Sequence, residues 1–530
     1  MRGEVMKEEK EDGENENSHN KSSQLSRKKA KRLAAKAAYK ERRKARRLNA
    51  GSGRSKVFEA DGLENVQYFI HGNLRHTKPY MFDYVARTKA RWFGRGILEV
   101  YSAEFVAYSK EYYKKAIESG RITVNGTTVS TDYKLKDGDK IKHSVHRHEP
   151  PVSADPVVVH FEDDETVVVS KPSGLPMHPC GQYRHNSLTY ILAKQRNDIL
   201  HQVHRLDRLT SGLVVMAKTA DRAASLSKQI RLNQVQKTYL ARVRGRFPTG
   251  PEAFKDRLQE DSSMITCHTR KEEEGKTTTA SSSSFYPPSS SSSPPLPSLP
   301  PKTTLITVSA PIACADKRVG KQVCGERAVA IHKADIAKRK GQIELKREQW
   351  EKTLKHAQTT FRLLSYDGTT SLIECKPKTG RTHQIRVHLE WLGYPIANDP
   401  CYGGQLFESN SYPPYGGLHT RDKRDEDQKE EGSSKKVNDT CEGDEKSVVS
   451  LDIEQFRQNH TDSQKICFQC REGSYWTDSR RRCSHIWLHA LKYEGDNGWV
   501  YEVPVPSWAK ESFDSRNACS KVLPFRQHDA

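Results

Sequence analysis

The stretch HRLDRLTSGL (204–213) places Asp207 between two arginines, Arg205 and Arg208, and just before a Ser-Gly turn. Nearby positive charge favours the ionised form of a carboxylate. An ionised aspartate held in a loop can act as a nucleophile, a base or an electrostatic anchor. The simpler interpretation is a loop aspartate that closes an Asx turn. The ten-residue string as a whole is what favours chemistry at Asp207.

Basic and aromatic side chains with suitable chemistry stand in three further strings, KPSGLPMH (171–178), KTY (237–239) and TGRTHQIRVH (379–388). They supply Lys171, Tyr239, Arg381 and Arg386. Lys171 is interpreted as a phosphate contact or as a turn residue, not as an acid–base group. Tyr239 could also be an ordinary strand tyrosine of the core. The spacing of His383 and His388 does not match the i, i+4 pair of a helical zinc site, so no catalytic metal is expected.

A separate group of side chains has the ligand count and approximate spacing of a structural zinc site: Cys467, Cys470, Cys483 and His485. Zinc bound by thiolates and imidazole is one interpretation, and free reduced thiols are the other. The 11 cysteines are scattered along the chain and follow no secretory signal, which favours a reducing compartment.

The charge of the chain indicates a polyanionic partner. The formal net charge is +21, which favours nucleic acid first and an anionic membrane second. No stretch approaches the roughly 18 apolar residues of a membrane span. The apolar share is only 34%, so part of the chain is expected not to fold.

Composition divides the chain into segments. Residues 1–60 form an acidic and then a basic arm, which could serve nuclear import or contact RNA. A region rich in aromatic and basic residues follows at 67–150, and the prolines at 150 and 151 mark a boundary. A folded domain is predicted over 151–508, interrupted by polar or low-complexity inserts, with a tail after it; the inserts are 258–303, 334–355 and 408–465, and the tail is 509–530.

Apolar periodicity and turn signals predict alternating strands and short helices in the folded parts. The predicted strands are 121–126, 166–170, 211–219, 237–245, 360–366, 371–376, 486–493 and 499–503. The predicted helices are 105–117, 221–234 and 382–392. This order favours an α+β fold with a mixed or antiparallel sheet.

Taken in order, the strings around Lys171, Asp207, Tyr239 and Arg381 resemble those of the RluA-type pseudouridine synthases. The resemblance covers about 67–257, 304–407 and 484–508, and the region 67–150 resembles an S4-type RNA-binding module. Its N-terminal part is most similar to the eukaryotic tRNA-modifying branch, which implies modification of position 32 in the anticodon loop. Some fungal members carry a deaminase domain, whose Pro-Cys-x-x-Cys signature is absent from this sequence.

The resemblance implies a role for each site residue. Asp207 matches the catalytic aspartate, Tyr239 the tyrosine that stacks on the base, and Arg381 the basic partner of the aspartate. Arg205 matches the residue that fills the space of the flipped base, although it could be a phosphate contact. Lys171 and Arg386 are further RNA-binding candidates, and Leu213 and Ile385 apolar support for the site.

Isomerisation gains no atom and changes no oxidation state, so no cofactor is expected. RNA, and tRNA in particular, is the expected partner, with neither a membrane nor an obligate protein partner. The cytoplasm or nucleus is the expected location, with the mitochondrion left open because relatives differ. The alternative function is a non-catalytic RNA-binding or RNA-folding factor that keeps the synthase fold.

Overall fold

The computed structural model describes residues 63–71, 73–105, 108–254, 264–271, 302–316, 320–340, 354–412 and 482–523. The predicted N-terminal arm lies outside these residues, as does most of the insert predicted at 408–465. None of the described helices is long and apolar enough to cross a membrane.

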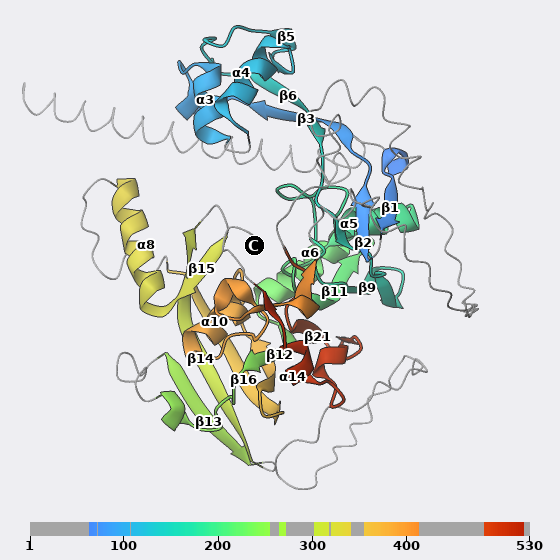
Figure 1. The fold of residues 1–530 in the computed structure, drawn as a ribbon, viewed down its shortest axis with the longest axis vertical. Helices are drawn as coiled ribbons and strands as arrows, with labels where there is room; N and C mark the ends of the chain where they lie inside the picture. Colours follow the sequence, from blue (N-terminus) through green and yellow to red (C-terminus); the bar gives the residue numbers. More distant parts are fainter. Residues whose placement is uncertain are drawn as a thin grey trace, which may run out of the picture. The chain divides into compact units, whose positions relative to one another are not determined.

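One twelve-stranded sheet forms the framework of the domain after Pro151 (Figure 1). Its main path runs β13-β14-β16-β17-β12-β21-β11-β9-β8. These strands are β13 (Ile265–Lys271), β14 (Lys302–Asp316), β16 (His356–Tyr366), β17 (Thr370–Pro377), β12 (Val235–Arg244), β21 (Leu488–Gly495), β11 (Ser211–Ala217), β9 (Thr166–Lys171) and β8 (Val158–Glu162). Short strands β10 (His201–Gln202), β15 (Lys321–Cys324) and β22 (Val500–Glu502) pair with β11, β14 and β21.

The pairings of this sheet are antiparallel, except that β11 and β21 run parallel over two residue pairs. The predicted α+β fold with a mixed sheet is therefore confirmed. The helices of this domain are α5 (Leu188–Arg196), α6 (Ala220–Arg231), α8 (Gly325–Lys340), α10 (Gln384–Leu392) and α14 (Ser515–Ala518).

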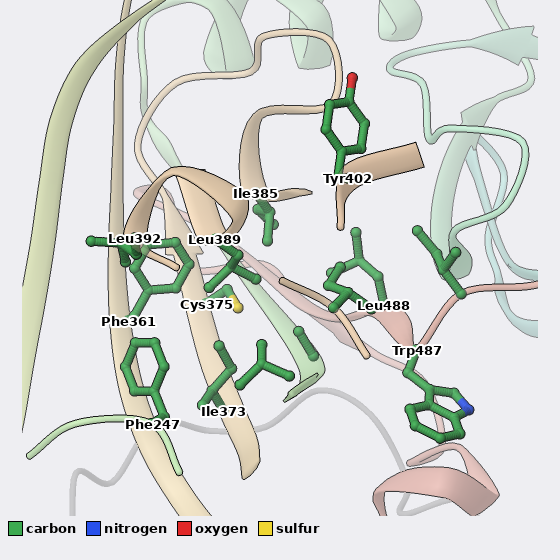
Figure 2. Close-up of a cluster of buried hydrophobic side chains, with 14 of the residues drawn as sticks. Phe247, Phe361, Ile373, Cys375, Ile385, Leu389, Leu392, Tyr402, Trp487 and Leu488 are labelled. Carbon is green, nitrogen blue, oxygen red and sulfur yellow. The ribbon is translucent and has the colours of Figure 1, made fainter. Parts of the chain in front are cut away.

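Two separate hydrophobic clusters stabilise the sheet. The first gathers side chains of β12, β14, β16 and β17 under α10. Figure 2 shows Ile385, Leu389 and Leu392 of this helix directed toward Cys375 and Phe361. The second cluster packs β9, β11 and α5 together with part of β21. Asp207 and Tyr239 lie at the boundary between the two clusters.

The region 80–147 folds as a small α+β unit with its own core. Its strands are β3 (Tyr80–Arg87), β4 (Ile122–Val124), β5 (Thr127–Thr128) and β6 (Lys140–Arg147), and its helices are α3 (Ile97–Glu104) and α4 (Lys110–Glu118). The predicted Asn-Gly turn after β4 is present, with φ of 53° at Asn125 and 86° at Gly126, as a type I′ hairpin requires. Tyr113 and Ile117 of α4 pack on Ile122 and Ile141 in one cluster.

Short strands complete the described structure. β1 (Tyr68–His71), β2 (Leu74–Thr77) and β7 (Val152–Ser153) form a three-stranded sheet. Two further pairs are β18 (Leu406–Phe407) with β23 (Val522–Leu523), and β19 (Ser411–Tyr412) with β20 (Arg482–Cys483).

The segment boundaries predicted from composition differ from the structure at three places. β13 lies inside the predicted 258–303 insert and pairs with β14 over seven residues. α8 begins at Gly325, nine residues before the predicted charged insert at 334. The predicted tail contains α14 and β23, and β23 pairs with β18. At β13 and β23 composition was insufficient because polar stretches can still supply strands, whose backbone hydrogen bonds do not depend on apolar side chains.

Candidate active site

The Asp207 loop, residues 204–210, is fixed between the two hydrophobic clusters. Leu206, 5% exposed, is buried in the second cluster, and Leu209, also 5% exposed, in the first. Asp207 stands between these two anchors, and its side chain is 18% exposed. The Thr210 amide closes a tight turn by donating to the Asp207 carbonyl at 3.2 Å. The apolar residues of the HRLDRL string therefore hold its acid at a partly open boundary between two cores.

The KPSG segment clamps the same loop through its carbonyl groups. Lys171 is 1% exposed. Its ammonium donates to the carbonyls of Pro172 (2.8 Å), Leu175 (2.9 Å) and Arg208 (3.2 Å). The Ser173 hydroxyl donates to the Leu209 carbonyl. Since an ammonium has three donors, these carbonyls occupy all of them, which favours the turn-residue interpretation of Lys171 over the predicted RNA contact.

Gly212 permits the close approach of β11 to β21 directly after the loop. Its φ is +107°, and a Cβ atom there would lie 2.2 Å from the Ala490 carbonyl oxygen. The next contact upstream joins the Ser211 hydroxyl to His489 Nδ1 at 2.9 Å. The glycine of the TSG sequence is thus required by backbone packing behind Asp207.

His204 fastens the start of the loop to β11. Its Nε2 accepts the backbone N–H of Val215 at 3.0 Å, so the ring is neutral with its proton on Nδ1. Burial, together with the nearby charge of Lys237, lowers the pKa of His204 to about 3. Protonation of this ring would break the hydrogen bond to Val215.

This geometry predicts that acid weakens the fold through His204. The folded-state pKa of about 3 lies below the usual value of about 6.5. The stabilising contribution is therefore complete above about pH 6.5 and is lost as the pH falls toward 3. Between pH 7 and 5 this residue should remove about 2 kcal/mol of unfolding free energy. Urea unfolding at pH 7 and pH 5 should show that wild type loses about 2 kcal/mol more unfolding free energy than His204→Gln. An equal loss in both proteins would contradict the neutral, buried state of His204.

Two cationic or donor groups face the Asp207 carboxylate. Arg386 Nη1 lies 3.7 Å from Asp207 Oδ2, and His383 Nε2 lies 3.8 Å from the same oxygen. Arg386 is 4% exposed and forms a bidentate pair with Asp399, at 2.6 and 3.0 Å. Because Asp399 orients the guanidinium from the far side, Arg386 presents a fixed positive edge to Asp207.

The structure does not bring Arg381 to Asp207. Its side chain is exposed and its Nε donates to the His356 carbonyl at 3.1 Å. The predicted charge partner is therefore wrong in identity, because Arg381 precedes α10 whereas Arg386 lies within its buried first turns. Arg386, which was predicted to bind RNA, instead has a buried guanidinium that pairs with Asp399 and faces Asp207, and its contact with RNA stays a prediction. Asp399, in the ANDPCYG string, was the signal that could have identified Arg386.

Tyr239 lies on β12 where its pairing with β21 is irregular. The register shifts between Thr238 and Tyr239, and such bulges re-aim side chains. The Tyr239 hydroxyl is 2.6 Å from that of Tyr493, a partner that the sequence did not suggest. Burial raises the pKa of Tyr239, the hydrogen bond with Tyr493 opposes this shift, and the charge of Asp207 adds to it, so that the pKa is about 12. Tyr239 contacts both hydrophobic clusters, so it lies at the same boundary as Asp207.

The remaining predicted site residues divide by exposure. Arg205 is exposed, which leaves its guanidinium accessible to RNA. Leu213 is fully buried in the second cluster and Ile385 is 6% exposed in the first. These two side chains support the site from opposite cores.

The predicted zinc ligands are only partly described. Cys467 and Cys470 lie outside the described residues. Cys483 is buried, burial raises the pKa of its thiol to about 12, and the thiol lies 3.3 Å from the His485 carbonyl. His485 Nδ1 contacts the Ser484 hydroxyl at 2.9 Å. Across the described ranges no group of His, Cys, Asp and Glu side chains has the arrangement of a metal site.

Comparisons with known proteins show which family this chain belongs to. A family model described as RNA pseudouridylate synthase matches residues 165–391, and an S4 domain model matches 100–141. The chain is 32% identical to the mitochondrial tRNA pseudouridine(32) synthase of Saccharomyces cerevisiae, over 87% of this chain and 81% of that protein. It is 32% identical to RNA pseudouridine synthase 7 of Arabidopsis thaliana, over 84% of this chain and 89% of that protein. The tRNA pseudouridine(31) synthase of Saccharomyces cerevisiae is 28% identical, over 84% of this chain and 98% of that protein.

The S4-like region and the resemblance inferred from the catalytic strings are both confirmed by these matches. The chain belongs to the RluA-type RNA pseudouridine synthases, enzymes that isomerise uridine to pseudouridine in RNA.

Proposed function

We propose that this enzyme modifies tRNA, at uridine 32 of the anticodon loop, with Asp207 as the catalytic carboxylate. The observation that carries the catalytic part is the placement of Asp207 Oδ2 3.7 Å from Arg386 and 3.8 Å from His383. The substrate part is supported by the names of two relatives, one a tRNA pseudouridine(32) synthase and the other a tRNA pseudouridine(31) synthase.

The chemistry requires one bond to break and one to form. The bond between N1 of uracil and C1′ of the ribose breaks, the base turns, and C5 joins C1′. The proton of C5 is released and N1 takes up a proton, so the product has the composition of the substrate. Asp207 acts either as a nucleophile at C1′ or along a glycal route, in which a ribose proton is removed.

The other site residues serve base flipping and orientation. Unstacking the target base costs about a few kcal/mol, and the exposed Arg205 fills the vacated space in the RNA. Tyr239 contacts the base from β12, with its hydroxyl tied to Tyr493. Arg386 and His383 hold the carboxylate from the protein side. An RNA-binding or RNA-folding factor without activity would not need this arrangement of charges.

The substrate proposal is tested with unmodified tRNA transcripts carrying tritium at C5 of uridine. We expect the wild-type enzyme to release tritium from transcripts with uridine at position 32. Replacement of that uridine by cytidine should remove the release, whereas replacement at position 31 should leave it intact. The reverse pattern would move the target to position 31. Release from ribosomal RNA fragments alone would contradict a tRNA substrate, and no release from any RNA would favour the binding factor.

We propose that the substrate pool includes cytoplasmic or nuclear tRNA, with mitochondrial tRNA as a further candidate. The basic stretch within residues 21–47 supports the cytoplasmic or nuclear location. The name of one relative, a mitochondrial tRNA pseudouridine(32) synthase, supports the mitochondrial one. Fractionation of cells that express the tagged full chain, followed by mapping of pseudouridine in each tRNA pool, distinguishes them. Enzyme and modification found only in mitochondria would contradict the first location.

A further inference from the structure

His383 has an unusual backbone for a residue that faces a catalytic carboxylate. Its φ is +56°, in the left-handed region, at the position that precedes α10. Histidine enters this region more readily than bulky or branched residues, yet it is still uncommon there. Strained backbone of this kind persists only when surrounding contacts enforce it. The contacts of the His383 ring indicate what this backbone conformation provides for the site.

One nitrogen of the ring is hydrogen-bonded, and the other faces Asp207. Nδ1 lies 2.7 Å from the hydroxyl of Tyr402, and Nε2 lies 3.8 Å from Asp207 Oδ2. The Tyr402 hydroxyl also accepts the backbone N–H of Gln322 at 2.9 Å. Figure 2 shows the Tyr402 ring beside the first hydrophobic cluster, with its hydroxyl directed away from the apolar side chains.

These hydrogen bonds determine where the protons lie. The Gln322 amide can only donate, so it occupies a lone pair of the Tyr402 oxygen. Burial raises the pKa of Tyr402, so the phenol keeps its proton. Among the described residues, the acceptor in reach of that proton is His383 Nδ1. Burial also lowers the pKa of His383, against the opposing effect of Asp207, so the ring is neutral. A neutral ring that accepts at Nδ1 carries its proton on Nε2.

We infer that Tyr402 fixes the tautomer of His383 so that Nε2–H faces Asp207, which makes His383 a positioning residue for uridine isomerisation. Both Arg386 and His383 address Oδ2. No ion pair or hydrogen bond from the described residues reaches the other oxygen, Oδ1. The two donors therefore set the rotation of the carboxylate and leave Oδ1 for the substrate.

In this arrangement, different residues supply the positive charge beside the Asp207 carboxylate and the donor that orients it. Arg386 supplies a positive charge to Oδ2, whereas the neutral His383 adds a directional donor. The 3.8 Å separation of His383 Nε2 from Oδ2 exceeds an ordinary hydrogen bond. Catalytic hydrogen bonds that are long in a free enzyme commonly tighten when substrate binds. The inference rests on the proposed role of Asp207.

The first test compares two substitutions at His383 by steady-state tritium release over a range of tRNA concentrations. Leucine removes the donor, whereas glutamine keeps one near the position of Nε2, and both impose similar strain at a φ of 56°. We expect His383→Leu to lower kcat about 100-fold and His383→Gln to recover most of that loss, with little change in the KM for tRNA. Equal loss in both variants would overturn the inference.

The second test reads the tautomer directly. In the ¹⁵N spectrum of histidine-labelled enzyme, the signals that His383→Leu removes should be those of an Nε2–H ring. Tyr402→Phe should introduce the Nδ1–H form and lower kcat about tenfold. The matched control is Tyr366→Phe, which removes an exposed hydroxyl bound to the Gly368 carbonyl and should change neither. An Nδ1–H ring in wild type would overturn the inference. If wild type releases no tritium from any RNA, the proposed function fails, while the tautomer can still be read.

Discussion

The Asp207→Asn enzyme is expected to release no measurable tritium from its RNA substrate. The amide has nearly the shape of the carboxylate but neither its charge nor its nucleophilic oxygen. Loss of a nucleophile commonly lowers turnover by more than about 10⁴-fold. Binding of tRNA should be almost unchanged, because the exposed Arg205 and the S4 unit do not depend on this charge. Tritium release and a filter-binding Kd, measured on the same preparation, check both parts.

The control for this prediction is Asp221→Asn, which neutralises an acid of the first turn of α6 and should leave turnover intact. If Asp207→Asn turned over at a rate within about tenfold of wild type, Asp207 would not be the catalytic carboxylate. Loss of tRNA binding together with turnover would indicate instead that Asp207 supports the RNA interface.

Arg386→Leu is expected to destabilise the fold as well as the site. Asp399 is fully buried, and Arg386 donates two hydrogen bonds to it. Removal of one partner leaves an unpaired buried charge, which costs about 3–5 kcal/mol. Asp207 loses its nearest cation in the same variant. Urea unfolding should show the loss of stability, and tritium release measured on the folded fraction should show the loss of turnover.

Two companion variants separate these effects. Arg381→Leu removes an exposed guanidinium, which should change the unfolding free energy by less than about 0.5 kcal/mol. The double variant Arg386→Leu with Asp399→Asn no longer buries an unpaired charge, so it should regain part of the stability but none of the turnover. A double variant as unstable as Arg386→Leu would show that packing, not charge, dominates at Arg386.

The features that could be predicted from the sequence are those whose residues lie in one continuous stretch. The HRLDRLTSGL string led to Asp207, and apolar runs bounded by turn signals located β9, β11, β12 and β21. The turn and strand signals after α4 were sufficient to identify the S4-like unit. These features depend on local periodicity and turn residues, which a single sequence displays directly.

Contacts between distant strings were harder to predict. Arg381 and Arg386 are five residues apart, and only the start of α10 decides which of them is buried beside Asp399. The charge of Lys171 suggested a contact with RNA. Its ammonium instead donates to three carbonyl groups, one of which belongs to Arg208 of the Asp207 loop. Tyr493 and Tyr402 approach the site from far along the chain. Their roles follow from tertiary packing, for which a strand or loop sequence has no local signal.

The central claim is that uridine isomerisation depends on an Asp207 carboxylate held by Arg386. Its most direct test is the single-turnover rate of Arg386→Lys beside that of Arg381→Lys, measured with the same tRNA and with enzyme in saturating excess. Lysine cannot pair in bidentate fashion with Asp399 and also face Asp207. We predict a rate about 100-fold lower for Arg386→Lys and a rate within about threefold of wild type for Arg381→Lys. A normal rate in Arg386→Lys together with a large loss in Arg381→Lys would contradict the claim.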